Sequence, residues 1–94
     1  MKKAISIYEK LTIDWLTNLV EWNRIIQDKS KNLTEFEREL DKNTEITLNI
    51  DSNGVVVIYN QDCYFGPLEI GTFDTKTSVI KLLDGLGIEL KENT

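Results

Sequence analysis

The sequence predicts a small α+β domain in which a three-stranded antiparallel meander packs against a long N-terminal helix and a C-terminal helix. Three observations predict this fold class. Both ends of the chain carry apolar residues at helical spacing, the middle alternates apolar and polar residues, and a turn sequence divides the alternating part. The 94 residues have the length of one domain, 1–94. The expected order of elements is α-α-β-β-β-α.

The first expected element is one long amphipathic helix over residues 3–28. Neither glycine nor proline interrupts this segment, and its apolar side chains recur every three or four positions. The resulting stripe contains Tyr8, Leu11, Trp15, Leu19, Trp22 and Ile26. At 1.5 Å per residue the helix would be about 39 Å long, which is more than a small sheet covers. We therefore expect it to bend, or to project one end toward a partner.

A second, shorter helix is expected over residues 34–42. Thr34 and Glu37 match the capping box, in which the two side chains satisfy backbone N–H groups at the start of a helix. Phe36 and Leu40 fall on one face of this helix, whereas Glu35, Glu37 and Glu39 spread around it.

The middle of the chain predicts a β-hairpin with strands over residues 44–50 and 55–60. Residues 51–54 read Asp-Ser-Asn-Gly, and asparagine and glycine tolerate the positive φ of tight turns. A two-residue loop and a four-residue loop both fit, so two registers stay open. In both registers the same side chains of the second strand face the core: Val55, Val57 and Tyr59.

A third strand over residues 63–73 and a closing helix over residues 75–86 complete the expected fold. Gly66 and Pro67 interrupt the third strand, and because proline cannot donate to a strand ladder, this strand is expected at the sheet edge. The closing helix carries apolar residues at the spacing of one helical face: Val79, Leu82, Leu83 and Leu86.

The residue inventory excludes most catalytic chemistry. The chain has no histidine and one cysteine, which removes the commonest general base, the usual catalytic triads and most zinc sites. Cys63 is expected to be a core residue of the third strand. The glycines match no phosphate-binding loop. We expect no catalytic residue, no cofactor and no metal, and hence a protein that is not an enzyme.

The charge favours a basic partner. The net charge is −5, and in residues 51–94 three lysines stand against seven carboxylates. Such a chain lacks the Lys and Arg clusters that bind phosphate backbones, so direct nucleic-acid binding is not expected. No segment approaches the ~18–20 apolar residues of a membrane span, and a single cysteine suits a cytoplasmic protein.

Two features are typical of a binding surface. Trp15 and Trp22 stand seven residues apart on the expected stripe, where they either fill the core or anchor an interface. A scatter of carboxylates on the sheet rim and last helix either serves solubility or imitates a nucleic-acid backbone. These carboxylates belong to Glu45, Asp51, Asp62, Glu69, Asp74 and Asp84.

The expected function is non-enzymatic binding by a small acidic inhibitor, encoded by a phage or mobile element, that blocks a basic surface of a nucleic-acid-binding host enzyme. In size, charge and mixed α/β build, the chain is similar to several anti-CRISPR proteins, a likeness of class. Two alternatives stay open. One is an immunity or antitoxin protein that neutralises a basic toxin. The other is a homo-oligomeric accessory protein, such as a homodimer, with the Trp15 and Trp22 stripe as its interface.

Overall fold

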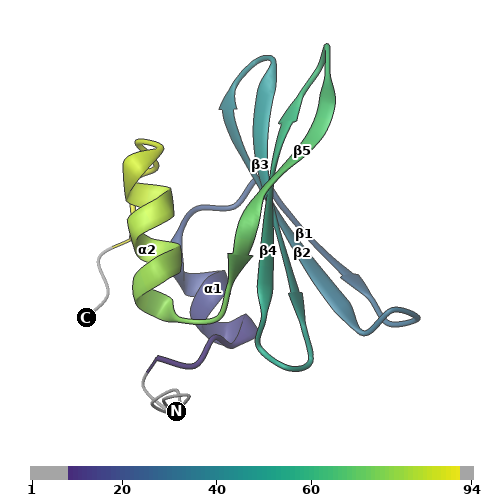
Figure 1. The fold of residues 1–94 in the computed structure, drawn as a ribbon, viewed down its shortest axis with the longest axis vertical. Helices are drawn as coiled ribbons and strands as arrows, with labels where there is room; N and C mark the ends of the chain where they lie inside the picture. Colours follow the sequence, from purple (N-terminus) through teal and green to yellow (C-terminus); the bar gives the residue numbers. More distant parts are fainter. Residues whose placement is uncertain (1–8, 92–94) are drawn as a thin grey trace.

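The computed structural model describes residues 9–91, which form two helices and a five-stranded antiparallel sheet. Helix α1 (Ile13–Leu19) precedes the strands and helix α2 (Lys76–Gly85) follows them. The strands are β1 (Arg24–Asp28), β2 (Leu33–Asp41), β3 (Thr44–Asp51), β4 (Val56–Asp62) and β5 (Gly66–Phe73). They lie side by side in sequence order, so each neighbouring pair is a hairpin. Both helices cover one face of the twisted sheet (Figure 1).

The prediction of one helix over residues 3–28 is wrong. Residues 3–8 lie outside the described part of the chain, α1 ends at Leu19, and the residues from Arg24 onward form strand β1. Trp15 and Trp22 therefore do not share a helical stripe, because Trp15 lies in α1 and Trp22 lies in the segment before β1.

Contacts of Trp22 explain why the helix does not continue. The backbone leaves helical geometry at Val20, where φ is −142° and ψ is 158°. The indole Nε1–H of Trp22 then donates to the carbonyl of Leu16 at 2.7 Å, and its ring lies 5.2 Å from the ring of Phe36. A half-buried indole needs a partner for its N–H, and this reversed path supplies one. Trp22 thus stands at helical spacing in the sequence but lies in the loop between α1 and β1.

The prediction of a short helix over residues 34–42 is also wrong, because this segment is strand β2. Thr34 and Phe36 are buried, while the residues between and after them are acidic, which is the two-residue period of a strand. The capping-box match is coincidental, since Glu37 binds Arg24 of β1 instead of a backbone N–H. With β1 and β2 added, the expected three-stranded meander becomes a five-stranded sheet.

The turn between β3 and β4 has three loop residues, 52–54, a length between the two that the sequence favoured. The Asp51 carboxylate accepts hydrogen bonds from the backbone N–H of Asn53 at 2.8 Å and of Val55 at 3.1 Å. The N–H of Asp51 donates to the carbonyl of Val55 at 3.2 Å, and Gly54 takes a φ of +78°. This closure fixes the register of the two strands.

The register corrects the predicted core of β4. Ile50 pairs with Val56, so the strand is shifted by one residue from both expected alignments, and a shift of one residue exchanges the two faces. Val56 and Ile58 are fully buried. The expected core residues are only half-buried: Val55, Val57 and Tyr59.

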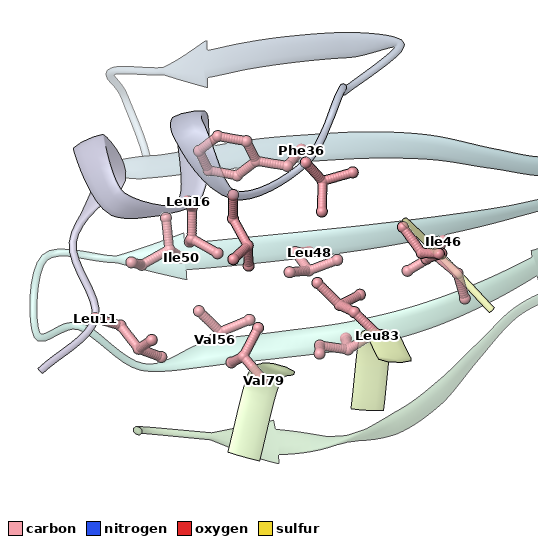
Figure 2. Packing of buried hydrophobic residues seen from close by; sticks show 13 residues of the cluster. Leu11, Leu16, Phe36, Ile46, Leu48, Ile50, Val56, Val79 and Leu83 are labelled. Atoms are coloured by element: carbon pink, nitrogen blue, oxygen red, sulfur yellow. The ribbon is translucent and has the colours of Figure 1, made fainter. Parts of the chain in front are cut away.

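The core lies between the helices and the middle of the sheet (Figure 2). Each helix contributes two side chains that are buried on their sheet-facing side, and the strands supply alternating residues. The cluster comprises Leu11, Leu16, Leu19, Val20, Phe36, Ile46, Leu48, Ile50, Val56, Ile58, Val79, Leu83 and Ile88. The middle strands β3 and β4 therefore carry most of the strand contribution to stability.

Substitutions at two glycines test how Leu11 packs on the β3–β4 turn, with Gly66 of the β4–β5 hairpin as the control. Gly54 and Gly66 have φ values of +78° and +76°, but a Cβ on Gly54 would meet the carbonyl oxygen of Leu11 at 2.9 Å, whereas a Cβ on Gly66 would meet nothing within 4 Å. We expect Gly66→Ala to lower the free energy of unfolding by about 1–2 kcal/mol from left-handed strain alone. Gly54→Ala adds a backbone clash and is expected to lower it further, as measured by urea denaturation. Equal losses would contradict the packing of Leu11 on this turn.

Candidate functional site

Charged side chains gather on the sheet face opposite the helices, here called the open face. Because strand residues alternate between the two faces, the neighbours of buried Phe36 and Leu48 point away from the core. The charged residues of the open face on β1, β2, β3 and β5 include Arg24, Glu35, Glu37, Glu39, Glu45 and Glu69. These six residues place five carboxylates and one guanidinium on this face.

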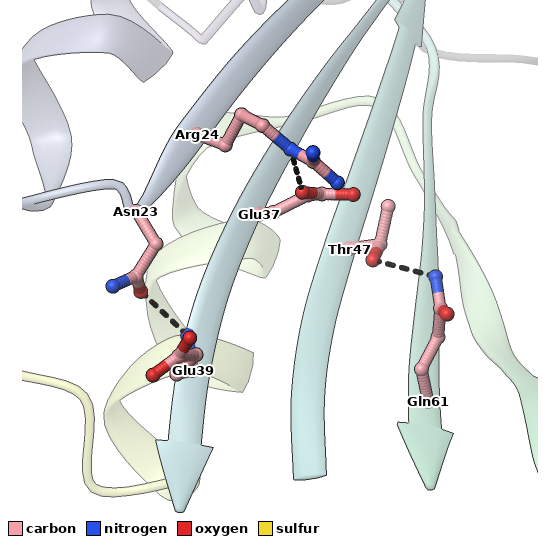
Figure 3. A network of polar contacts seen from close by, with 6 residues as sticks. All are labelled: Asn23, Arg24, Glu37, Glu39, Thr47 and Gln61. Atoms are coloured by element: carbon pink, nitrogen blue, oxygen red, sulfur yellow. Dashed lines mark hydrogen bonds and ion pairs between the residues drawn. The ribbon is translucent and has the colours of Figure 1, made fainter. Parts of the chain in front are cut away.

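Arg24 and Glu37 form an ion pair on the open face between the edge strand β1 and its neighbour β2 (Figure 3). They are direct cross-strand partners, and Nε of Arg24 lies 2.6 Å from a carboxylate oxygen of Glu37. The Glu37 side chain is only 8% exposed, and burial alone would raise its pKa. The hydrogen bond from Arg24, followed by a hydrogen bond with Glu35 and by the guanidinium charge, outweighs burial and lowers the pKa of Glu37. Thr47, the partner of Glu37 on β3, is covered by Gln61, whose amide donates to its hydroxyl at 2.9 Å.

The negative charges of the other carboxylates near this pair are neutralised less than the charge of Glu37. Burial raises the pKa of Glu35, and the hydrogen bond and negative charge of Glu37 raise it further. Burial and the charge of Glu37 also raise the pKa of Glu45. Glu39 stands directly opposite Glu45, and like charges in that position destabilise a sheet. The cluster therefore holds more negative charge than the fold neutralises.

A hollow of about 470 Å³ continues this acidic region at one end of the sheet. It lies between the β2–β3 and β4–β5 turns, which a hydrogen bond from the N–H of Cys63 to the carbonyl of Asn43, 3.0 Å long, ties together. Its charged lining residues are Glu39, Asp41, Lys42, Glu45 and Asp62. Four carboxylates against one ammonium make this end hollow strongly electronegative.

The structure brings together only part of the predicted carboxylate set. Glu45 and Asp62 line the end hollow, and Glu69 lies on the open face opposite Tyr59. Asp51 and Asp74 lie at the other end of the sheet, where Asp51 serves the β3–β4 turn. The sixth carboxylate, of Asp84, is exposed on α2, in the helical layer on the other side of the sheet.

The two tryptophans lie in different surroundings. Trp15 is half-buried, and the Nζ atom of Lys76 lies 5.6 Å from its ring centroid, within cation–π range. Trp22 packs on Phe36 at the sheet face that the helices cover. Both pack against the core, and their role in partner binding stays a prediction.

Sequence reasoning missed two groups of site residues. Glu35, Glu37 and Glu39 were expected to spread around a helix, although their alternation with Thr34 and Phe36 was the signal of a strand with one acidic face. Cys63 was expected in the core of a strand. It is exposed in the β4–β5 turn instead, because β4 runs to Asp62 and the chain reverses before β5 begins.

The comparisons give no relative from which a role could be transferred. Models of protein families, curated proteins and solved structures yield no match to this chain. Within residues 9–91, no group of three side chains from His, Cys, Asp or Glu is placed to hold a metal ion. Neither helix in that range has the length and apolar character needed to span a membrane.

The uncompensated charge predicts an unusual pH response. Because the pKa of Glu35 in the folded protein lies above its ordinary value of 4.5, its ionisation at neutral pH opposes folding. Glu35→Gln should therefore raise the free energy of unfolding at neutral pH. The gain should shrink as the pH falls through the folded pKa and vanish below 4.5, as urea denaturation at several pH values would measure.

Glu37→Gln is the matched control with the opposite sign. The pKa of Glu37 is lowered in the folded protein. Its carboxylate therefore stabilises the fold at pH values above its ordinary pKa of 4.5, and this stabilisation is lost as the pH falls through the folded pKa. The variant should be less stable than the natural protein at neutral pH. A loss of stability in Glu35→Gln at neutral pH would show that the carboxylate cluster is compensated after all.

Proposed function

We propose that this protein is a small non-enzymatic inhibitor that binds a basic protein surface through its open face and end hollow. The observation that supports it most is the direct opposition of Glu39 and Glu45 beside the Arg24–Glu37 pair. Like charges in register weaken a sheet, and within residues 9–91 neither carboxylate has a salt-bridge partner. A partner that supplies lysine or arginine side chains would provide the missing compensation.

The spacing of the carboxylates suits a groove that normally holds nucleic acid. Residues that alternate along a strand lie about 6.8 Å apart, and neighbouring strands lie about 4.8 Å apart. Negative charge repeated along β2 at Glu35, Glu37 and Glu39, with Glu45 beside it on β3, resembles a phosphate backbone in kind. A groove built for phosphates presents several Lys and Arg side chains. Occupying that groove would exclude the nucleic acid and inhibit the enzyme.

The source and setting belong to the same proposal. A phage or mobile element is the expected origin of such an anti-CRISPR-like inhibitor, and a single cysteine suits action in the cytoplasm. An immunity protein against a basic toxin would use the same carboxylates, and the identity of the captured protein would distinguish the two. An oligomer built on one helical stripe of Trp15 and Trp22 is not proposed, because that stripe does not exist.

An affinity capture from the native host, with two matched variants, tests the proposal. Glu39→Gln/Glu45→Gln removes two charges from the end hollow, and Asp84→Asn/Glu89→Gln removes two exposed charges outside the sheet. We expect the first variant to bind the captured protein about tenfold or more weakly, and the second to bind it like the natural protein. The affinities are measured by titrating the purified captured protein.

Salt and nucleic acid provide the second readout. The interaction should weaken steeply as salt approaches about 1 M, where the Debye length falls to about 3 Å. Duplex DNA or RNA should compete for the captured protein. Binding that is unchanged by salt and by Glu39→Gln/Glu45→Gln would refute the proposed function.

A further inference from the structure

The end of the β4–β5 hairpin exposes three large apolar side chains, two in the turn and one in β5. Tyr64 is 77% exposed, Phe65 is 90% exposed and Leu68 is 70% exposed, whereas no residue of the core cluster exceeds 5%. We call these three residues the aromatic tip. Single exposed apolar residues are common on proteins, but two aromatic rings and a leucine within five positions form a patch of the kind that marks interaction sites. In Figure 1 this hairpin extends beyond both helices.

The aromatic tip is held in place before any partner binds. The Asp62 carboxylate accepts a hydrogen bond from the N–H of Tyr64 at 2.7 Å, and Asp62 pairs with Gly66 across the turn. Gly66 adopts a φ of +76°, which closes the reversal, and the N–H of Cys63 binds the neighbouring β2–β3 turn. Binding through a pre-formed turn loses less conformational entropy than binding through a flexible loop.

Negative charge borders the aromatic tip on the side of the end hollow. Asp62 and Cys63 line that hollow and directly precede Tyr64 in the chain. The same hollow contains the carboxylates of Glu39 and Glu45. An occupant of this end of the sheet would therefore meet an apolar projection and an acidic concavity side by side.

We propose that the aromatic tip inserts Phe65 into an apolar pocket of a partner protein, and that lysine or arginine side chains on the rim of this pocket enter the end hollow. This inference rests on the proposed function, because it assigns the apolar anchor and the partner chemistry to the same site. Screened surface charges contribute little affinity by themselves, whereas a buried aromatic anchor is a typical hot spot of an interface. The charges then set the orientation and the choice of partner.

The charge distribution disfavours two other occupants. An anionic membrane surface would repel the carboxylates of Asp62, Glu45 and Glu39 next to the aromatic tip. A second copy of the chain would bring a second set of the same carboxylates against the first, and like-charge juxtaposition opposes association. A basic protein surface with an apolar pocket would match both the aromatic tip and the carboxylates of the end hollow.

Cys63 allows a direct test with the full chain. It is the one cysteine of the sequence and is exposed beside the aromatic tip, so a photoreactive maleimide can be attached there without a mutation. After capture of the host protein, cross-linked peptides are identified by mass spectrometry. We expect them to line one apolar pocket flanked by Lys or Arg. Cross-links to an acidic surface or to scattered sites would overturn the inference.

Affinity measurements with the purified captured protein complete the test. Phe65→Ser and, separately, Tyr64→Ser should weaken binding about tenfold or more, as removal of an aromatic hot spot does. Ile25→Thr is the control, because Ile25 is 44% exposed on β1 at the opposite edge of the sheet, and it should leave the affinity unchanged. All three variants must retain the natural unfolding midpoint, which exposed positions permit.

The possible outcomes separate this inference from the proposed function. If Glu39→Gln/Glu45→Gln weakens binding while Phe65→Ser and Tyr64→Ser do not, the acidic site stands and the aromatic tip is not its anchor. If no captured protein depends on Glu39 and Glu45, the proposed function fails and this inference fails with it. An environment-sensitive dye on Cys63 that responds to phosphatidylcholine or phosphatidylserine vesicles would assign the tip to a membrane. A dimer in sedimentation that Phe65→Ser abolishes would assign it to a second copy.

Discussion

The three-residue turn between β3 and β4 determines which face of the sheet each side chain of β4 and β5 occupies. Asp51 holds the N–H groups of Asn53 and Val55, and Gly54 completes the reversal with a positive φ while packing against the backbone of Leu11. A loop shorter or longer by one residue would turn the side chains of β4 over, since strand residues alternate with a period of two. β5 pairs with β4, so its alignment depends on the same turn.

The alternation of side chains along the paired strands has two consequences. On one face it places Phe36, Leu48 and Ile58 under the helices, where their burial stabilises the domain. On the other face it places carboxylates of β2 and β3 next to one another. Exposed charges contribute little to stability, so this face can carry the opposition of Glu39 and Glu45 while the core holds the fold. The core and the proposed binding surface therefore lie on opposite sides of one sheet.

Local patterns in the sequence indicated the second half of the fold better than the first. β3, β4, β5 and α2 lie close to the expected ranges, because a turn sequence and a helix cap mark their ends. The first half depends on contacts between distant residues. The Trp22 ring meets Phe36, and Arg24 meets Glu37, and neither contact is visible in a spacing of three or four. Helical spacing and a capping-box match therefore predicted helices where the chain forms a loop and two strands.

The same difference applies to the site. Glu45, Asp62 and Glu69 could be placed near the sheet from the sequence, because they belong to the half with clear turns. Glu35 and Glu37 could not, since they join the site only when β2 is a strand paired with β1. The exposure of Phe65 also depends on where β4 ends. The expected third strand over residues 63–73 included Phe65, whereas β4 runs to Asp62 and β5 begins at Gly66, which leaves Phe65 in the turn.

The register between β3 and β4 is the central claim, and nuclear Overhauser effects between backbone protons test it most directly. Directly paired residues of antiparallel strands bring their Cα atoms to about 4.5–5.5 Å, and their Hα protons are closest in the pairs without mutual hydrogen bonds. The structure predicts an Hα–Hα effect between Leu48 and Ile58 and another between Ile50 and Val56. Effects between Leu48 and Tyr59 instead would contradict the three-residue turn, and with it the burial of Val56 and Ile58 on the core face.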